Sequence, residues 1–367
     1  MPQPSRRIGR PALALALVAS LCAACASSAE APDATPAPPT DVAPPAASLP
    51  AASPTPAASV TIAAVGDVSL ARQLVERMQA AGPDYPFALV APLLAADIGF
   101  ANLEGALTEG GSPWPKAYNF RTPPSLAAGL PRAGFHVVSL ANNHTMDYGA
   151  SGLRDTVAAL DAIGVRHAGA GDNLAQAAAP VVERANGLRV AFVACVLTPS
   201  EGGGFDIHAW SAAAAAPGVF VCDDARLAAA VGEARRAADF VVVAVHAGDE
   251  YRTAPSATQR RLADVALGAG ADVYLGAHAH VVQPVEQREG QLIAWGLGNF
   301  IFDLDPVDLA NIPQPRVSLI LKLTLTKGAG VTSFEALPLT LDADQDRPRP
   351  ATTDEAAALR RLVDGVQ

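Results

Sequence analysis

Acidic and imidazole side chains stand where short apolar runs of this chain give way to loops. Six residues are placed in this way: Asp67, Glu104, His144, His246, His278 and His280. Carboxylate oxygens and neutral imidazole nitrogens are common ligands of divalent cations in proteins. Because packing alone does not account for so many ligand-type residues at equivalent positions, the sequence predicts one metal site assembled from five loops.

The apolar runs predict the elements that must carry these residues. Nearly all-apolar runs rich in Val, Ile, Leu and Ala predict buried strands at 60–65, 98–101, 137–140, 190–196, 240–245, 273–275 and 292–295. Helical spacing predicts helices at 71–81, 151–163, 223–238 and 256–269. Alternating strands and helices imply an α/β protein with both sheet faces covered. Two later runs, 317–326 and 331–339, predict a hairpin that completes a second sheet or a sheet edge.

Ligands of open α/β folds collect outside the carboxyl ends of strands, and the ligand-type residues of this chain follow that rule. Taken alone, most of the motifs keep a second interpretation. Glu104 could equally start a helix, the turn at 142–144 could be an Asx-capped turn, and His246 could be a hydrogen-bonded core residue. The alternating pair His278 and His280 is the strongest single motif, because both imidazoles can turn toward one cation when the strand ends in a bent loop.

Five segments, in one order along residues 60–340, resemble the signatures of the CapA family, which is named for poly-γ-glutamate capsule proteins. They are 100–104, 139–144 with 147–149, 246–251, 276–280 and 298–303, and their Ala-Asn-Asn-His and Gly-Asn-Phe motifs are highly specific. The family is in turn similar to calcineurin-like metallophosphoesterases. The resemblance therefore implies a single-domain, four-layer αββα metallophosphoesterase-like sandwich with a two-metal centre at the strand ends.

The resemblance also implies a role for each ligand-type residue. Carried over by position, one metal is held by Asp67 and His280, the other by Asn143, His246 and His278, and Glu104 bridges the two. His144 is left free as the general acid that protonates a leaving oxygen. Two divalent cations in such a centre share a hydroxide, and these ligand types are compatible with Mn, Fe or Zn.

Three places depart from the family patterns, and at one of them Asn102-Leu103-Glu104 replaces the Gly-Asp with a further downstream acid that is usual in the phosphoesterases. Ser69 stands where those enzymes have a histidine after the first aspartate, which removes one ligand from the first metal. That metal is then held weakly, completed by water, or completed by Glu250. Ala279 stands where the family often has proline, and this change leaves both neighbouring imidazoles in place.

Four further residues are predicted to contact substrate: Asn142, Glu250, Arg121 and Asn299. For Asn299 the second interpretation is that it organises the Gly-Asn-Phe turn. Arg121 belongs to a proline-rich loop at 110–124, which is either a lid over the site or a surface Ω-loop.

The first 26 residues read as an export signal, in which three arginines precede an apolar stretch at 11–24 that is too short to span a bilayer. Cleavage after Ala24 would leave Cys25 for lipid attachment, and cleavage after Ala26 would release the protein. The chain is therefore expected in the cell envelope, periplasmic or extracellular, either anchored by a lipid on Cys25 as its one membrane contact or released.

Composition divides the rest of the chain. Residues 27–59 are rich in Ala and Pro and are expected to form a disordered linker. Residues 60–345 are expected to form the CapA-type domain, and residues 346–367 a tail with a short helix. The net charge of −10, without a basic cluster, argues against nucleic acid as a partner, so an anionic substrate has to be attracted by metal. Cys195 and Cys222 are either a disulfide or two free thiols.

Two functions follow. The first is an exported metal-dependent hydrolase that cleaves a phosphoester or related bond in an anionic cell-surface polymer or its phosphorylated precursor. The alternative is a non-catalytic, metal-containing accessory subunit that binds an acidic polymer within a membrane complex for capsule synthesis or export. His144 favours the enzyme, and Ser69 favours the accessory protein.

Overall fold

Two large β-sheets form the centre of the structure, a computed structural model that describes residues 57–201, 204–342 and 347–365. The larger sheet runs in the order β18 (Pro348–Pro350), β17 (Gly330–Leu341), β16 (Val317–Thr326), β1 (Ser59–Val68), β2 (Ile98–Leu103), β5 (Val137–Ser139) and β6 (Arg166–Ala168), with β15 (Asn299–Ile301) also paired to β1. The second runs in the order β13 (Val285–Arg288), β14 (Gln291–Ala294), β12 (Val273–Ala277), β11 (Phe240–Ala247), β9 (Leu188–Leu197) and β8 (Val181–Ala185). Two-stranded pairs join β3 (Ala106–Leu107) to β4 (Arg121–Thr122) and β7 (Ala170–Gly171) to β10 (Gly218–Val219).

Helices and short 3-10 turns connect the strands. The helices are α1 (Gln73–Ala81), α2 (Gly129–Ala133), α3 (Gly149–Ala162), α4 (Leu174–Ala178), α5 (Asp224–Ala237), α6 (Ala257–Gly268), α7 (Pro306–Asn311) and α8 (Thr353–Val363), and the 3-10 turns are η1 (Tyr85–Phe87), η2 (Ala91–Leu94), η3 (Pro124–Ala128) and η4 (Ile207–Trp210). Side-chain caps fix where α5, α6 and α8 begin, and at α6 Ser256 and Gln259 form a capping box. None of the described helices has the length and apolar composition needed to cross a bilayer.

Strand β9 shows why the predicted apolar runs form buried strands. Its alternate residues Phe192 and Val196 point into the core between the sheets, whereas Val193 and Cys195 point toward the helices on the outer face. A strand that is covered on both faces needs apolar residues at every position, so the sequence shows a continuous run instead of an alternation. All seven predicted strands and all four predicted helices are present, with ends that differ by a few residues.

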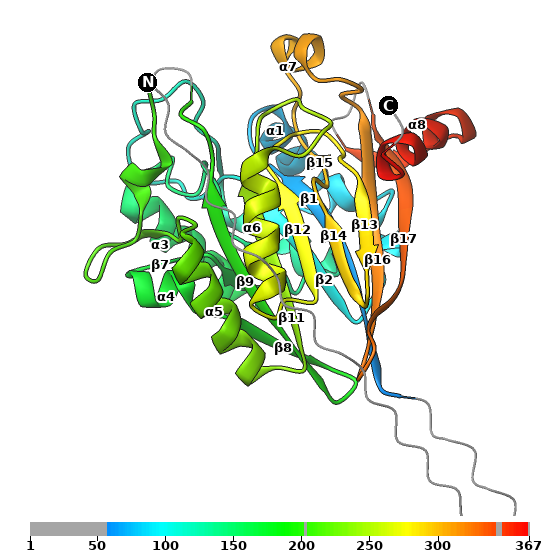
Figure 1. Cartoon of the computed structure of the whole chain (residues 1–367). Coiled ribbons are helices and arrows are strands. Elements are labelled where there is room, and N and C mark those ends of the chain that lie inside the picture. Colours follow the sequence, from blue (N-terminus) through cyan, green and yellow to red (C-terminus); the bar gives the residue numbers. More distant parts are fainter. Residues whose placement is uncertain (1–56, 202–203, 343–346, 366–367) are drawn as a thin grey trace, which may run out of the picture. The chain divides into compact units, whose positions relative to one another are not determined.

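The two sheets face each other and helices cover the outside, which confirms the four-layer αββα sandwich. The Phe100 ring of β2 stacks on the Phe192 ring of β9 with centroids 5.6 Å apart, so the inner faces are in direct contact. Helices α5 and α6 lie over the six-stranded sheet (Figure 1), and their Leu227 and Leu262 are buried against it. Buried residues of α1, α2 and α3 pack on the side of the eight-stranded sheet.

The late hairpin joins the larger sheet, because β16 pairs antiparallel with β1 and β17 pairs with β16. Residues after 345 extend this edge: β18 pairs with β17, and Leu359 and Val363 of α8 lie in the main core. The predicted export signal and almost all of the predicted linker lie outside the described residues.

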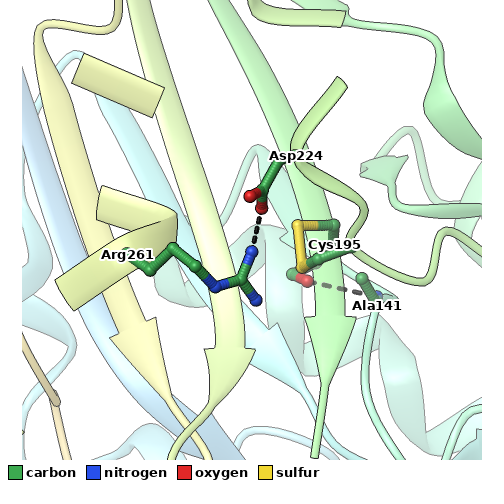
Figure 2. The surroundings of a disulfide bond; sticks show 6 residues. Ala141, Cys195, Asp224 and Arg261 are labelled. Carbon is green, nitrogen blue, oxygen red and sulfur yellow. Dashed lines mark hydrogen bonds and ion pairs between the residues drawn. A yellow bond between two sulfur atoms is a disulfide. The ribbon is translucent and has the colours of Figure 1, made fainter. Parts of the chain in front are cut away.

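A disulfide joins Cys195, in β9, to Cys222, which lies two residues before α5; their Cα atoms are 5.1 Å apart (Figure 2). The same view shows an ion pair between Asp224 of α5 and Arg261 of α6. The disulfide ties the start of α5 to the sheet that this helix covers.

Removing this disulfide should destabilise the domain. The bonded cysteines are 27 residues apart, and closing a loop of that length in the unfolded chain corresponds to about 3.5 kcal/mol in the loop-entropy model. We expect the Cys195→Ala/Cys222→Ala variant to unfold at clearly lower urea concentration than the wild type, and the reduced wild type to behave similarly. An unchanged midpoint in both would show that the bond adds no stability.

Candidate metal centre

The parallel strands of both sheets end at one place, and the ligand-type residues converge there. Strands β1, β2 and β5 run parallel in one sheet, and β9, β11 and β12 run parallel in the other. Their carboxyl ends, or the residues that follow them, carry Asp67, Glu104, Asn143, His144, His246, His278 and His280, all of which are largely buried. The predicted convergence of distant residues is therefore present in the geometry.

Two carboxylates form the centre of the cluster. Asp67 and Glu104 are each 0% exposed, and Asn102 Nδ2 donates to Asp67 Oδ1 at 2.8 Å and to Glu104 Oε2 at 3.3 Å. Burial raises the pKa of Asp67, although His280 and Asn102 oppose the rise. Burial, reinforced by the charge of Asp67, raises the pKa of Glu104 well above its usual range. Two buried acids that share one amide donor favour the binding of a cation.

Two buried imidazoles, His246 and His278, belong to the same cluster as these carboxylates. His246 Nε2 lies 2.8 Å from Asn143 Oδ1, and the His246 and His278 rings are 4.8 Å apart. Burial, followed by the charges of neighbouring histidines, lowers the pKa of both His246 and His278 well below the usual value. The neutral imidazole that results is the form that binds metals.

The loop after β12 holds its two histidines in an uncommon backbone conformation. His278 has φ 88° and His280 has φ 55°, a region that residues other than glycine rarely adopt. Gly276 permits this loop to lie close to its neighbour, because a Cβ on it would be 1.8 Å from Trp295 O. Such strain persists where surrounding packing fixes the chain, and it is frequent at functional sites.

Asn299 orients His280 toward the carboxylates. Its Oδ1 lies 2.8 Å from His280 Nδ1, and strand β15, which carries it, pairs with β1 at Asp67. Gly66 makes that pairing possible, since a Cβ on Gly66 would be 1.9 Å from Gly298 O. His280 Nδ1 then lies 3.5 Å from Asp67 Oδ2 and its Nε2 3.9 Å from Glu104 Oε1.

Unpartnered buried atoms mark the place where a cation fits. Asp67 Oδ2, Glu104 Oε1 and His278 Nδ1 are buried and accept or donate no hydrogen bond among the described residues. Buried polar atoms normally have partners, and these three are of ligand type. Two groups have ligand atoms within 4.8 Å of one another: Asp67 with Glu104 and His246, and Glu250 with His278 and His280. The donor set therefore suits divalent cations.

These groups divide the histidines differently from the assignment that the family resemblance implied. His246 lies with the two carboxylates, whereas His280 lies with His278 and with Glu250, which is exposed. His280 also approaches Asp67 and Glu104, so it lies between the groups. The sequence predicts Glu250 as one residue that could replace the histidine ligand lost at Ser69. In the structure Glu250 lies beside His278 and His280, where it could bind a metal.

His144 is held at the edge of the cluster by two partners. Its Nδ1 lies 2.8 Å from Asp147 Oδ2, and its ring stacks on Phe120 with centroids 4.1 Å apart. Its Nε2 is 3.9 Å from Glu104 Oε1 and so faces the carboxylates. Burial, then the charges of Lys116, His280 and Arg72, lower the pKa of His144 well below its usual value. Burial raises the pKa of Asp147 to about 7, and Lys116 limits that rise.

Sequence patterns do not single out four residues that contact this centre: Asn102, Lys116, Asp147 and Glu201. Asn102 and Asp147 lie inside recognised motifs, which is a signal that could have identified them. Lys116 and Glu201 come from loops without periodicity. Asn143 Nδ2 donates to Glu201 Oε1 at 2.7 Å, so this glutamate fixes the amide of a ligand-type residue.

Two residues predicted to contact substrate lie away from the open part of the centre. Asn142 is fully buried. Its Nδ2 donates hydrogen bonds to Leu103 O and Asn102 Oδ1, and its Oδ1 accepts hydrogen bonds from the His144 N–H and the Thr145 hydroxyl. These bonds order the turn. Arg121 lies over the Tyr148 ring and lines a separate pocket of about 410 Å³ with Arg72, Glu76, Thr108, Glu109 and Pro123.

A pocket of about 330 Å³ leads to the imidazoles. It is lined by Ala117, Tyr118, Pro199, Ser200, Glu201, Asp249, Glu250 and His278. The loop at 110–124 contributes Ala117 and Tyr118 to its wall, and Phe120 of the same loop covers His144. Its three formally charged lining residues are all acidic, so anions are not attracted by the pocket wall.

The chain is thus a four-layer αββα sandwich with carboxylates and imidazoles at the strand ends. Residues 61–304 match the family model described as bacterial capsule synthesis protein PGA_cap, and the chain belongs to this family. It is 32% identical over 294 residues to the PGA biosynthesis protein CapA of Bacillus subtilis (strain 168), covering 79% of this chain and 73% of that protein.

Two further proteins are similar to this chain over about four fifths of its length. The chain is 30% identical over 312 residues to the capsule biosynthesis protein CapA of Bacillus anthracis, covering 82% of this chain and 72% of that protein. Among solved structures it is similar to a novel phosphatase from Mycoplasma pneumoniae, at 12% identity and a TM-score of 0.47, covering 77% of this chain and 94% of that one.

Metal binding should stabilise the protein, and the two carboxylates should be required for it. We expect saturating Mn²⁺ to raise the melting temperature and EDTA to reverse the rise, since a ligand at a hundredfold its Kd adds about 2.7 kcal/mol. Asp67→Asn and Glu104→Gln should lose most of this shift. Without metal, both variants should be at least as stable as the wild type, because each removes a buried charge.

Glu335→Gln is the matched control, because this glutamate is exposed on β17, which carries none of the ligand-type residues. It should keep the full Mn²⁺ shift. A Glu104→Gln protein that keeps the shift, or that unfolds easily without metal, would show that Glu104 is a structural core residue.

Proposed function

We propose that this protein is an exported, divalent-metal-dependent hydrolase that cleaves a phosphoester or related bond in the metabolism of an anionic cell-surface polymer. One observation carries the proposal: buried, unpartnered Asp67 Oδ2, Glu104 Oε1 and His278 Nδ1 lie beside a histidine that is held by a carboxylate. The names of the Bacillus relatives indicate capsule and PGA biosynthesis, so poly-γ-glutamate or its phosphorylated precursor is the substrate class we propose.

The residues that would hold the metals are those of the cluster. Asp67, Glu104 and His246 would bind one cation, with Asn143 as a further ligand beside His246. His278, His280 and Glu250 would bind the other, and His280 also lies near both carboxylates. Mn, Fe and Zn all suit this mixture of oxygen and nitrogen donors. When bound, such cations supply an activated hydroxide and neutralise charge on an anionic transition state.

His144 would deliver the proton to the leaving oxygen. Asp147 and Phe120 fix its ring, and Nε2 is the nitrogen that faces the centre. Burial, and after it the charges of Lys116, His280 and Arg72, lower the pKa of His144 and so disfavour the imidazolium. An anionic substrate placed beside Nε2 opposes those charges and favours protonation, so the acid would be formed in the substrate complex.

The remaining predicted contact residues would act in different places. Asn299 positions His280, and Asn142 orders the turn that carries Asn143 and His144. Arg121 would contact only parts of a long substrate that extend beyond the centre, because it lines another pocket.

Export is supported by the Cys195–Cys222 disulfide, since such bonds persist in oxidising compartments. The signal-like residues 1–26 and the lipid site at Cys25 agree with it but lie outside the described residues. We propose a location in the cell envelope, with a lipid on Cys25 as the one membrane attachment and a polymer-synthesis complex as the partner.

Ser69 favours a second candidate function. It is buried at the position where the phosphoesterases have a histidine ligand. A centre with one ligand fewer could bind an acidic polymer through its metals without turnover, as an accessory subunit during capsule synthesis or export.

Replacing His144 separates the two functions. With Mn²⁺ bound, we expect the wild type to hydrolyse members of a panel of phosphodiesters and phosphomonoesters, and His144→Ala to lower kcat by about 10² to 10⁴. Metal content, measured by elemental analysis, should stay unchanged. His208→Ala is the control, because the His208 side chain is 63% exposed.

Three results are informative. Turnover that survives in His144→Ala would remove the general-acid role. A metal-loaded wild type that turns over nothing in the panel would favour the accessory function. Loss of metal in His144→Ala would instead make this histidine a ligand.

A further inference from the structure

We propose that Lys116 is a positioning residue of the metal centre: its buried ammonium fixes Asn143, a proposed ligand, and the pair formed by His144 and Asp147. This inference rests on the proposed metal centre. Lys116 comes from the loop at 110–124, more than twenty residues before the turn that it would position.

The Lys116 side chain is 0% exposed and is surrounded by groups that suit an ammonium ion. Its Nζ lies 2.9 Å from Asp147 Oδ1 and 3.7 Å from Glu201 Oε2, and it donates to the backbone oxygen of Asn143. The Phe205 and Trp210 rings have centroids 5.0 Å from Nζ. A buried charge is tolerated only when it is paired and hydrogen-bonded, and this one has two carboxylates and two aromatic faces.

The same ammonium fixes Asn143 from one side while Glu201 fixes it from the other. Lys116 binds the Asn143 backbone oxygen, and Glu201 accepts from its Nδ2. These contacts leave Asn143 Oδ1 facing His246 Nε2 at 2.8 Å. A ligand whose amide is held in this way has its oxygen oriented before a cation arrives.

Lys116 also shapes the environment of His144. Asp147 uses Oδ1 for Lys116 and Oδ2 for His144 Nδ1 and the Phe120 N–H. Lys116 Nζ is itself 3.4 Å from His144 Nδ1. Removing the ammonium would therefore release Asp147, and with it the partner that sets the orientation of the imidazole.

The test uses metal alone as the probe. We expect Lys116→Met in the full chain to bind Mn²⁺ about tenfold or more weakly by calorimetry, as is typical when a group that orients a metal ligand is removed. The visible absorption of the Co²⁺-loaded variant should also differ from that of the wild type, because the spectrum reports ligand geometry. Lys327→Met is the control, since this lysine is 62% exposed.

A second variant covers the case in which Lys116→Met fails to fold. Lys116→Met/Asp147→Asn removes both charges of the buried pair, so no uncompensated carboxylate remains at Asp147. It should fold, as judged by circular dichroism, and show the same weakened Mn²⁺ binding and altered Co²⁺ spectrum.

Native Mn²⁺ affinity and an unchanged Co²⁺ spectrum in a folded Lys116 variant would overturn the positioning role and leave the metal centre intact. A wild-type protein that binds neither Mn²⁺ nor Co²⁺ would overturn the metal centre itself, and the role of Lys116 with it. The two failures are therefore distinguishable by the behaviour of the wild type.

Discussion

Two carboxylates buried beside each other, Asp67 and Glu104, impose the main constraint on this structure. Both are fully inaccessible to solvent, and each has an oxygen without a hydrogen-bond partner among the described residues. Moving an ionised carboxylate from water into a protein interior costs several kcal/mol unless a counter-charge lies nearby. Asn102 hydrogen-bonds both acids but carries no charge. The ionised form of this pair is therefore favoured by cations in the space between the strand ends.

The fold accommodates this cost because the site lies where two well-packed sheets end together. Continuous apolar runs make each strand rigid on both faces, and the stacked rings of Phe100 and Phe192 hold the sheets against each other. Against that support, the loop after β12 can hold His278 and His280 at positive φ. Gly66 and Gly276 allow the backbone contacts that bring these loops to the carboxylates.

The features that the sequence predicts well are those set by local pattern. A buried strand is visible as an apolar run, its end is visible as the first polar residue, and parallel strands bring such ends together; Asp67, His246 and His278 follow from these facts alone. Lys116 and Glu201 do not, because their loops carry no periodicity and their partners lie far away in the chain. For the same reason the sequence wrongly suggested that Arg121 contacts an anionic substrate at the centre, whereas Arg121 lines another pocket. The sequence also could not decide whether Cys195 pairs with Cys222.

The acidic wall of the pocket affects both candidate functions in the same way. The pocket wall contributes Glu201, Asp249 and Glu250, and the Lys116 side chain near the centre is buried and already paired with Asp147. The pocket therefore repels an acidic polymer or a phosphate ester unless divalent cations make its electrostatic potential positive. Catalyst and accessory binder alike depend on the metals for this attraction. The difference between them reduces to whether His144, once an anion lies beside it, becomes protonated and transfers that proton.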